Sequence, residues 1–203
     1  MLKRKFFTRT IRKFTRLLNS KDKFIGEHSR NVVKQSARIA KAMGLKKREI
    51  LEIKLAAFFH DIGKLEIDKA ILNKPGMLTK NEWQEVVKHP QTSVNILREA
   101  GILNSVIDIV KHHHERFGGG GYPDPEKSGK DIPIGSRIIA VADSFDAMVS
   151  KRPYRSRPMS REEAFMELRR FAGTQFDPEV VDAFLSINNV VLENAPLIYH
   201  VRS

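Results

Sequence analysis

Histidines and carboxylates are the residues of this chain whose types and spacing could support chemistry. The 203 residues include seven histidines and no cysteine. Adjacent His60 and Asp61 directly follow the apolar residues 56–59, where an unpaired carboxylate would be costly to bury. A bound metal ion would offset that cost. The alternative is a hydrogen-bonded core histidine beside an aspartate that caps the next turn, and these two residues alone do not separate the two interpretations.

Two further residues lie on apolar faces of expected helices. Asp143 stands in the middle of the apolar run 138–145, so it is expected to be largely buried. Either metal binding or an ion pair with Arg137 or Arg38 would explain it. His28 lies on the apolar side of the first long helix, where a lone histidine is more often a hydrogen-bonded core residue. Each position is ambiguous when taken alone.

The remaining histidines are weaker signals. His112, His113 and His114 end an expected helix, where histidines can interact with the helix dipole. His89 precedes Pro90 and indicates nothing by itself. Because the chain has no cysteine, thiolate metal sites, disulfides and a thiol nucleophile are excluded. Any metal must be held by histidine, carboxylate and water, which suit Fe, Mn, Mg or Zn.

The charge of the chain is unevenly distributed. The net charge is +12, and residues 1–18 carry seven basic residues and no acid. A basic balance favours a polyanionic partner. Apolar stretches all stop well short of the roughly 20 residues that a bilayer requires, and basic residues interrupt what would have to be the apolar centre of a signal peptide. We therefore predict a cytoplasmic protein, with a peripheral position at the inner face of the membrane as an option.

The hydrophobic periodicity is helical along almost the whole chain. It predicts helices over residues 20–43, 48–60, 104–113 and 133–149, a helix after Thr79 that Pro90 interrupts, and helices after Ser160 and Asp177. The fold expected is a single all-α helical bundle. A basic amphipathic helix over 1–19 precedes the domain at 20–187, and a tail follows at 188–203.

The order of these residues along the chain resembles a known family. His, His-Asp, His, His-His and Asp follow one another in the contexts HDIGK, KHP, HHE, GYP and VAD. This order is similar to the HD superfamily and, within it, to the HD-GYP cyclic di-GMP phosphodiesterases. The resemblance covers residues 21–184 and includes the stretches EHSRNV, AAFFHDIGK, LNKPGMLT, VKHP, HHERFGGGGYP, IPIGSRIIAVADSFDAM, RPYR and FDPEVV.

The resemblance implies a helical bundle of the HD type with two divalent metal ions, Fe or Mn. One ion would be bound by His28, His60, Asp61 and Asp143. The other would be bound by Asp61, His89, His113 and His114. Asp61 would bridge the ions, with a hydroxide held between them as the nucleophile, and Lys64 would contact a phosphate oxygen. The family's other substrate-binding positions correspond to Gly121, Tyr122, Arg152 and Arg155.

The sequence also departs from the family pattern. Gly118 stands where the family has Asp, and the segment after Pro123 is about one residue longer, so both changes alter the loop that follows the HHE motif. Phe24 occupies the position of a Glu that is found in members with three metals, which favours two ions here. His112 has no family role, and we expect it to be structural or exposed.

The expected activity is hydrolysis of cyclic di-GMP to linear pGpG, and the sequence leaves open whether pGpG or GMP is the end product. The alternatives are an HD phosphohydrolase acting on another nucleotide and a sensor that binds a cyclic dinucleotide without turnover, although the complete ligand set argues against the sensor. Residues 1–18 could contact an acidic membrane surface, nucleic acid or a partner protein, pack on the domain, or form a homodimer contact. No specific nucleic acid is expected.

Overall fold

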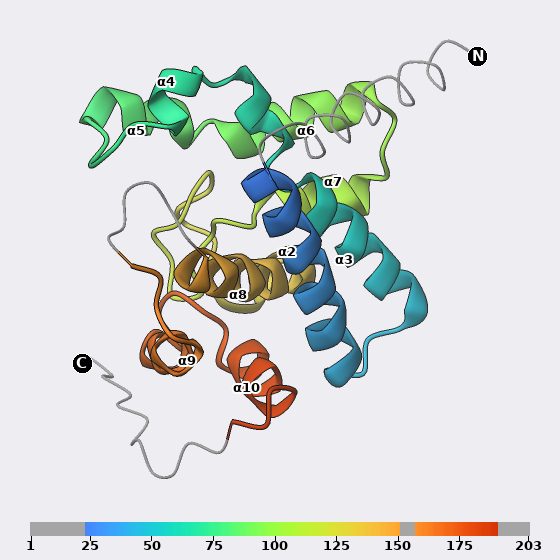
Figure 1. Ribbon diagram of the computed structural model, residues 1–203. Coiled ribbons are helices and arrows are strands. Elements are labelled where there is room, and N and C mark those ends of the chain that lie inside the picture. Colours follow the sequence, from blue (N-terminus) through green and yellow to red (C-terminus); the bar gives the residue numbers. More distant parts are fainter. Residues whose placement is uncertain (1–22, 151–156, 191–203) are drawn as a thin grey trace.

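The computed structural model describes residues 23–150 and 157–190, which are helical almost throughout (Figure 1). Within these ranges the β-type pairing is one isolated bridge between Ala172 and Phe176. The predicted all-helical class is confirmed. The elements are α2 (Lys23–Ala42), α3 (Lys47–Phe59), the 3-10 helix η1 (Ile62–Glu66), α4 (Lys69–Leu72), α5 (Lys80–Val86), α6 (His89–Glu99), α7 (Asn104–Lys111), the 3-10 helix η2 (Gly129–Asp131), α8 (Ile134–Val149), α9 (Arg161–Arg170) and α10 (Pro178–Ser186).

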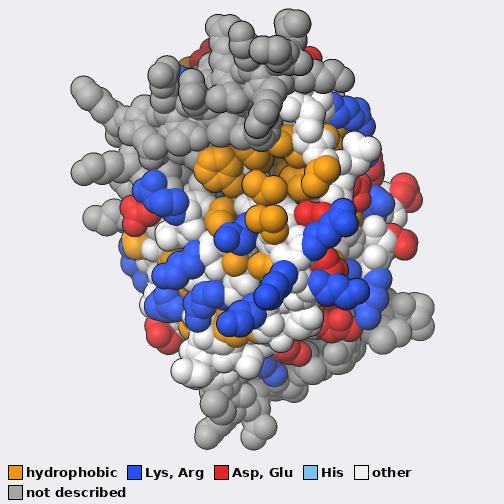
Figure 2. All heavy atoms as spheres, turned by 90° about the vertical axis from the view of Figure 1, so that its right-hand side faces the viewer, with side chains coloured by type: hydrophobic (Ala, Val, Ile, Leu, Met, Phe, Trp, Pro, Cys, Tyr) orange, Lys and Arg blue, Asp and Glu red, His pale blue; other side chains and the backbone are white. Residues whose placement is uncertain are grey.

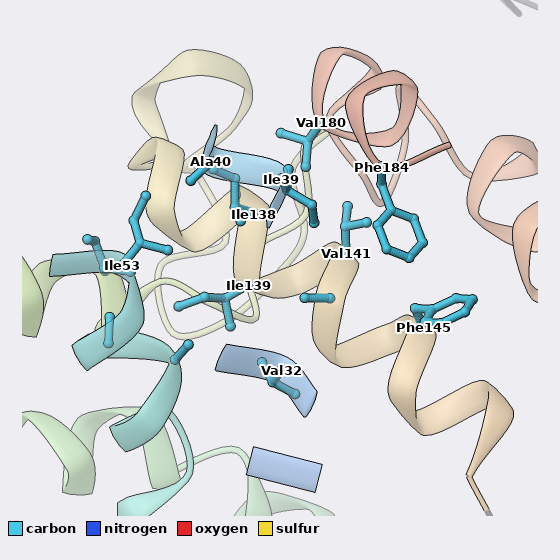
Figure 3. Packing of buried hydrophobic residues seen from close by; sticks show 14 of the residues in the cluster. Val32, Ile39, Ala40, Ile53, Ile138, Ile139, Val141, Phe145, Val180 and Phe184 are labelled. Carbon is cyan, nitrogen blue, oxygen red and sulfur yellow. The ribbon is translucent and has the colours of Figure 1, made fainter. Parts of the chain in front are cut away.

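Helix α8 is the centre of the bundle. It packs against α2, α3, α7, α9 and α10, which explains why its sequence is apolar on nearly every side. Figure 3 shows the resulting core, in which side chains of α8 meet side chains of α2, α3 and α10. The labelled residues are Val32, Ile39, Ala40, Ile53, Ile138, Ile139, Val141, Phe145, Val180 and Phe184.

Three predicted helix starts are confirmed by their caps. The hydroxyls of Thr79 and Ser160 accept hydrogen bonds from the third backbone N–H of α5 and α9. In each capping box, the side chain of the third helical residue, a glutamate, accepts from the backbone N–H of the capping residue. Asp177 caps α10, whose first residue is Pro178. These side chains satisfy N–H groups that have no partner within the helix.

The helix that begins after Thr79 is interrupted before Pro90, as predicted. Helix α5 ends at Val86, four residues before the proline, and Pro90 lies in the first turn of a new helix, α6, which begins at His89. A proline is tolerated there because the first N–H groups of a helix have no intrahelical acceptor. The restart places His89 at the N-terminal end of α6, where η1 packs against it.

Within the described ranges, no helix has the length and apolarity needed to cross a bilayer. The predictions for residues 1–19, Arg152, Arg155 and the tail beyond residue 190 fall outside the described residues.

Candidate metal centre

The structure brings the seven predicted ligand side chains together in two groups. The first group is His28, His60 and Asp143, and the second is Asp61, His89, His113 and His114. In each group, one candidate ligand atom from every residue lies within 4.8 Å of the others. The residues come from α2, α8 and α6 and from the segments that follow α3 and α7. The fold therefore assembles positions that are far apart in the sequence.

Asp61 faces both groups. One carboxylate oxygen lies 3.4 Å from Nε2 of His60 and the other lies 3.3 Å from Nε2 of His89. Its side chain makes no capping bond to η1, so the capping interpretation is wrong. His60 Nε2 and Asp61 Oδ1 are buried without a hydrogen-bond partner in the described part of the chain. Buried polar atoms are normally satisfied, and a cation between these nitrogen and oxygen donors would satisfy both.

Asp143 belongs to the first group and not to an arginine pair. Its Oδ1 lies 3.1 Å from Nε2 of His28. Of the two arginines considered, Arg137 pairs with Asp177 and Arg38 donates to groups on α2 and at the end of α10. The ion-pair alternative is therefore wrong.

In three of the histidines, a hydrogen bond from Nδ1 orients the imidazole ring. Nδ1 of His60, His89 and His113 each donates to the carbonyl three residues earlier, at distances of 2.8, 2.7 and 2.6 Å. Because a carbonyl only accepts, Nδ1 carries the proton and Nε2 keeps its lone pair. Such bonds fix the tautomer that a metal requires.

Asp146 plays the same orienting role for His28, and sequence reasoning missed it. Its carboxylate lies 2.6 Å from Nδ1 of His28 and accepts from the Asn31 amide at 2.8 Å. Asp146 is 4% exposed. The available signal was its position three residues after Asp143, since residues three apart share one helix face. Carboxylate–histidine pairs of this kind are typical of metal sites.

The electrostatics differ between the two groups. Burial opposes the charge of His28, but hydrogen bonds to Asp143 and Asp146 raise its pKa to about 9. Burial lowers the pKa of His89 to about 4, and burial together with the neighbouring His89 lowers that of His114 to about 3. The pKa of His113 also lies well below its usual value because of burial. The second group is therefore unprotonated at neutral pH, whereas His28 carries a proton.

This difference predicts a pH-dependent uptake of metal by the first group. An ion must displace the His28 proton, so apparent affinity should rise about tenfold per pH unit up to about pH 9. Uptake by the second group should be nearly constant above about pH 5, because its imidazoles are already neutral. Calorimetric Mn²⁺ titrations in buffers of different ionisation enthalpy should detect one proton released by the first group and none by the second. Equal proton release from both groups would contradict this assignment.

Lys64 and Tyr122 border the two groups. The ammonium of Lys64 lies 2.7 Å from Asp61 Oδ2. Burial would raise the pKa of Asp61, but Lys64 and the surrounding imidazoles hold it well below the usual range. The ring of Tyr122 stacks on His114 at 4.8 Å and 28°. The structure thus places both residues at the candidate centre, and their contacts with substrate remain predictions.

The loop after the HHE motif is held by groups that sequence reasoning did not use. His112 is buried, and its Nε2 lies 3.0 Å from Asp124, which also pairs with Lys111. The structural role expected for His112 is confirmed, and the alternative that its side chain is exposed is excluded. Glu115 accepts from the Asp124 backbone at 2.7 Å. A Cβ on Gly121 would stand 2.5 Å from the Glu115 Cα, so the loop itself requires glycine there.

Comparisons with known proteins agree with this geometry. The HD domain family model matches residues 12–180. A cyclic di-GMP phosphodiesterase of Thermotoga maritima is 44% identical over 82% of this chain and 45% of its own length. A 3'3'-cGAMP-specific phosphodiesterase of Vibrio cholerae is 38% identical over 79% of this chain and 31% of its own length. The chain thus spans less than half of either relative.

A solved structure shows the same fold. An HDGYP protein from Bdellovibrio bacteriovorus matches with a TM-score of 0.67 and 19% identity, over 84% of this chain and 54% of that one. The chain belongs to the HD domain family. Within that family, it is homologous to cyclic di-GMP phosphodiesterases of the HD-GYP type.

Proposed function

We propose that the chain hydrolyses a cyclic dinucleotide, with cyclic di-GMP as the leading substrate, in a domain spanning residues 20–187. The observation that carries this proposal is the pair of ligand groups that meet at Asp61. The 44% identity to a cyclic di-GMP phosphodiesterase supports the choice of substrate.

The reaction joins a water oxygen to phosphorus and breaks the ester bond to a ribose 3′ oxygen, which takes up a proton. The product is linear pGpG, and a second hydrolysis would give GMP. A pair of divalent ions lowers the pKa of water and neutralises charge on the phosphate. His28, His60, Asp61 and Asp143 would hold one ion, and Asp61, His89, His113 and His114 the other.

Protein groups would contribute beyond the metal ligands. Lys64 is 35% exposed and lies against Asp61, so its ammonium can reach a phosphate oxygen and stabilise developing negative charge. Gly121, Tyr122, Arg152 and Arg155 complete the proposed substrate contacts. Guanidinium forks suit phosphate oxygens and guanine edges.

The decisive experiment is a turnover assay on protein reconstituted with Fe²⁺ or Mn²⁺ under anaerobic conditions. The expected result is conversion of cyclic di-GMP to pGpG that stops when a chelator removes the metal. 3'3'-cGAMP serves as a second substrate, because a relative is specific for it. Tight binding without product at full metal occupancy would instead establish a sensor. Elemental analysis of the same preparation identifies the metal and tests the proposal of two Fe or Mn ions.

The same proposal includes a surface through which the domain contacts a partner. Helix α3 exposes Leu51 and Leu55, and Leu103 precedes α7. Figure 2 views the side on which α3 and α7 lie in Figure 1, and apolar side chains gather there above a band of Lys and Arg. A second copy of the chain or the apolar stripe of residues 1–18 fits such a surface.

We also propose that the protein is cytoplasmic and that residues 1–18 contact an acidic membrane surface. Deleting the segment and measuring liposome binding at low and high salt separates these alternatives, because an electrostatic surface contact weakens with salt. A change in oligomeric state after the deletion would support the dimer contact instead.

A further inference from the structure

Trp83 places an accessible aromatic ring next to the candidate metal centre. It lies on α5 and is 50% exposed. Its ring centroid is 6.1 Å from that of Tyr122, at an interplanar angle of 82°. Tyr122 stacks on His114 of the second ligand group. A continuous series of rings therefore leads from the ligand group to an accessible indole.

The core does not explain this tryptophan. Helix α5 has no buried residue, and polar contacts hold it in place. Glu82 closes the capping box with Thr79 and accepts from the Lys74 ammonium at 2.7 and 2.9 Å. A large aromatic side chain left half exposed beside a cluster of ligand groups is a typical feature of a binding surface.

The two rings have the geometry of a base-binding corner. A planar base that stacks on one ring meets the other ring edge-on, and both arrangements are favoured between aromatic groups. A nucleotide whose phosphate is bound at the ligand groups carries its base one sugar away, and the rings of Tyr122 and Trp83 extend outward from those groups.

Building on the proposed function, we propose that Trp83 and Tyr122 form an aromatic platform for one purine base of the cyclic dinucleotide. Stacking is tolerant of base identity, because every base has a π face. The platform therefore supplies affinity for cyclic di-GMP and 3'3'-cGAMP alike and does not select between guanine and adenine.

Replacing the indole tests the platform by kinetics. Stacking contributes about 5- to 150-fold in affinity per base, so Trp83→Ala should raise KM for both cyclic dinucleotides by a factor in this range. Trp83→Phe should retain most of the affinity, because it keeps an aromatic face. Metal content per chain, measured by elemental analysis, should stay unchanged in both variants, because Trp83 is not among the ligand groups. Met166→Ala is the matched control, because Met166 is 64% exposed on α9, away from α5 (Figure 1).

The chain offers an independent optical test. Trp83 is its single tryptophan, so intrinsic fluorescence reports on this residue alone. Rapid mixing of metal-loaded protein with cyclic di-GMP should change the fluorescence saturably before turnover, whereas inorganic phosphate, which has no ring to stack, should produce a much smaller change.

The outcomes separate the platform from the proposed function. Turnover without a fluorescence change, and with an unaltered KM in Trp83→Ala, would overturn the platform and leave the hydrolase intact. A saturable fluorescence change without turnover would support the platform and overturn the hydrolase. A parallel fall of turnover and metal content in Trp83→Ala, with KM unaltered, would show a purely structural role and contradict the platform.

Discussion

Asp61→Asn is expected to lower turnover of a cyclic dinucleotide by at least about 10²–10³-fold, the loss typical when one preorganised electrostatic group is removed. The carboxylate directs one oxygen toward each ligand group. An amide keeps the shape but loses the negative charge and one anionic oxygen, so it cannot serve two cations. Metal content per chain should fall in parallel, measured by elemental analysis beside the activity assay.

Asp182→Asn is the matched control for this change. Asp182 is exposed on α10, so the same substitution there should leave turnover and metal content unchanged. Far-UV circular dichroism of both variants checks that the bundle remains folded. Full metal occupancy and wild-type turnover in Asp61→Asn would remove Asp61 from the centre and contradict the shared-ligand arrangement.

The helices were predictable because their signals are local. The apolar run of α8 and the caps at Thr79, Ser160 and Asp177 each require only a few neighbouring residues. Helix α6 was the exception. The rule that proline ends a helix and the rule that proline favours the first turn both apply at Pro90, since α5 ends four residues before it and α6 begins beside it.

The sequence indicated which residues form the candidate centre, but it did not indicate which residues hold them in place. The order of His and Asp residues indicated which side chains should meet, through a family resemblance. The contact of His28 with Asp146 spans 118 positions, and that of His112 with Asp124 depends on the path of an irregular loop. The position of Trp83 beside Tyr122 likewise depends on where α5 lies. Helical periodicity carries no information about such contacts.

Gly63→Ala is expected to disrupt the same centre by steric means. Gly63 lies in η1, and an added Cβ would stand 2.2 Å from the His89 carbonyl oxygen and 2.8 Å from the Ser93 backbone nitrogen. Both are backbone atoms of α6, so no side-chain rotation relieves the clash. The Gly63 N–H also donates to the Ser93 hydroxyl at 2.9 Å. Helix η1 must therefore move away from α6, which separates Asp61 from His89.

The expected cost is about 3 kcal/mol, at the upper end for overpacking, or about 6–12 °C in Tm for a chain of this size. Metal uptake and turnover should fall further than stability does. Asp182→Ala is the control, because it introduces alanine at an exposed position of α10. Thermal melts and metal titrations of the two variants make the comparison. A Gly63→Ala protein that melts like the wild type and still binds metal would show that the close approach of η1 to α6 is not what holds Asp61 against His89.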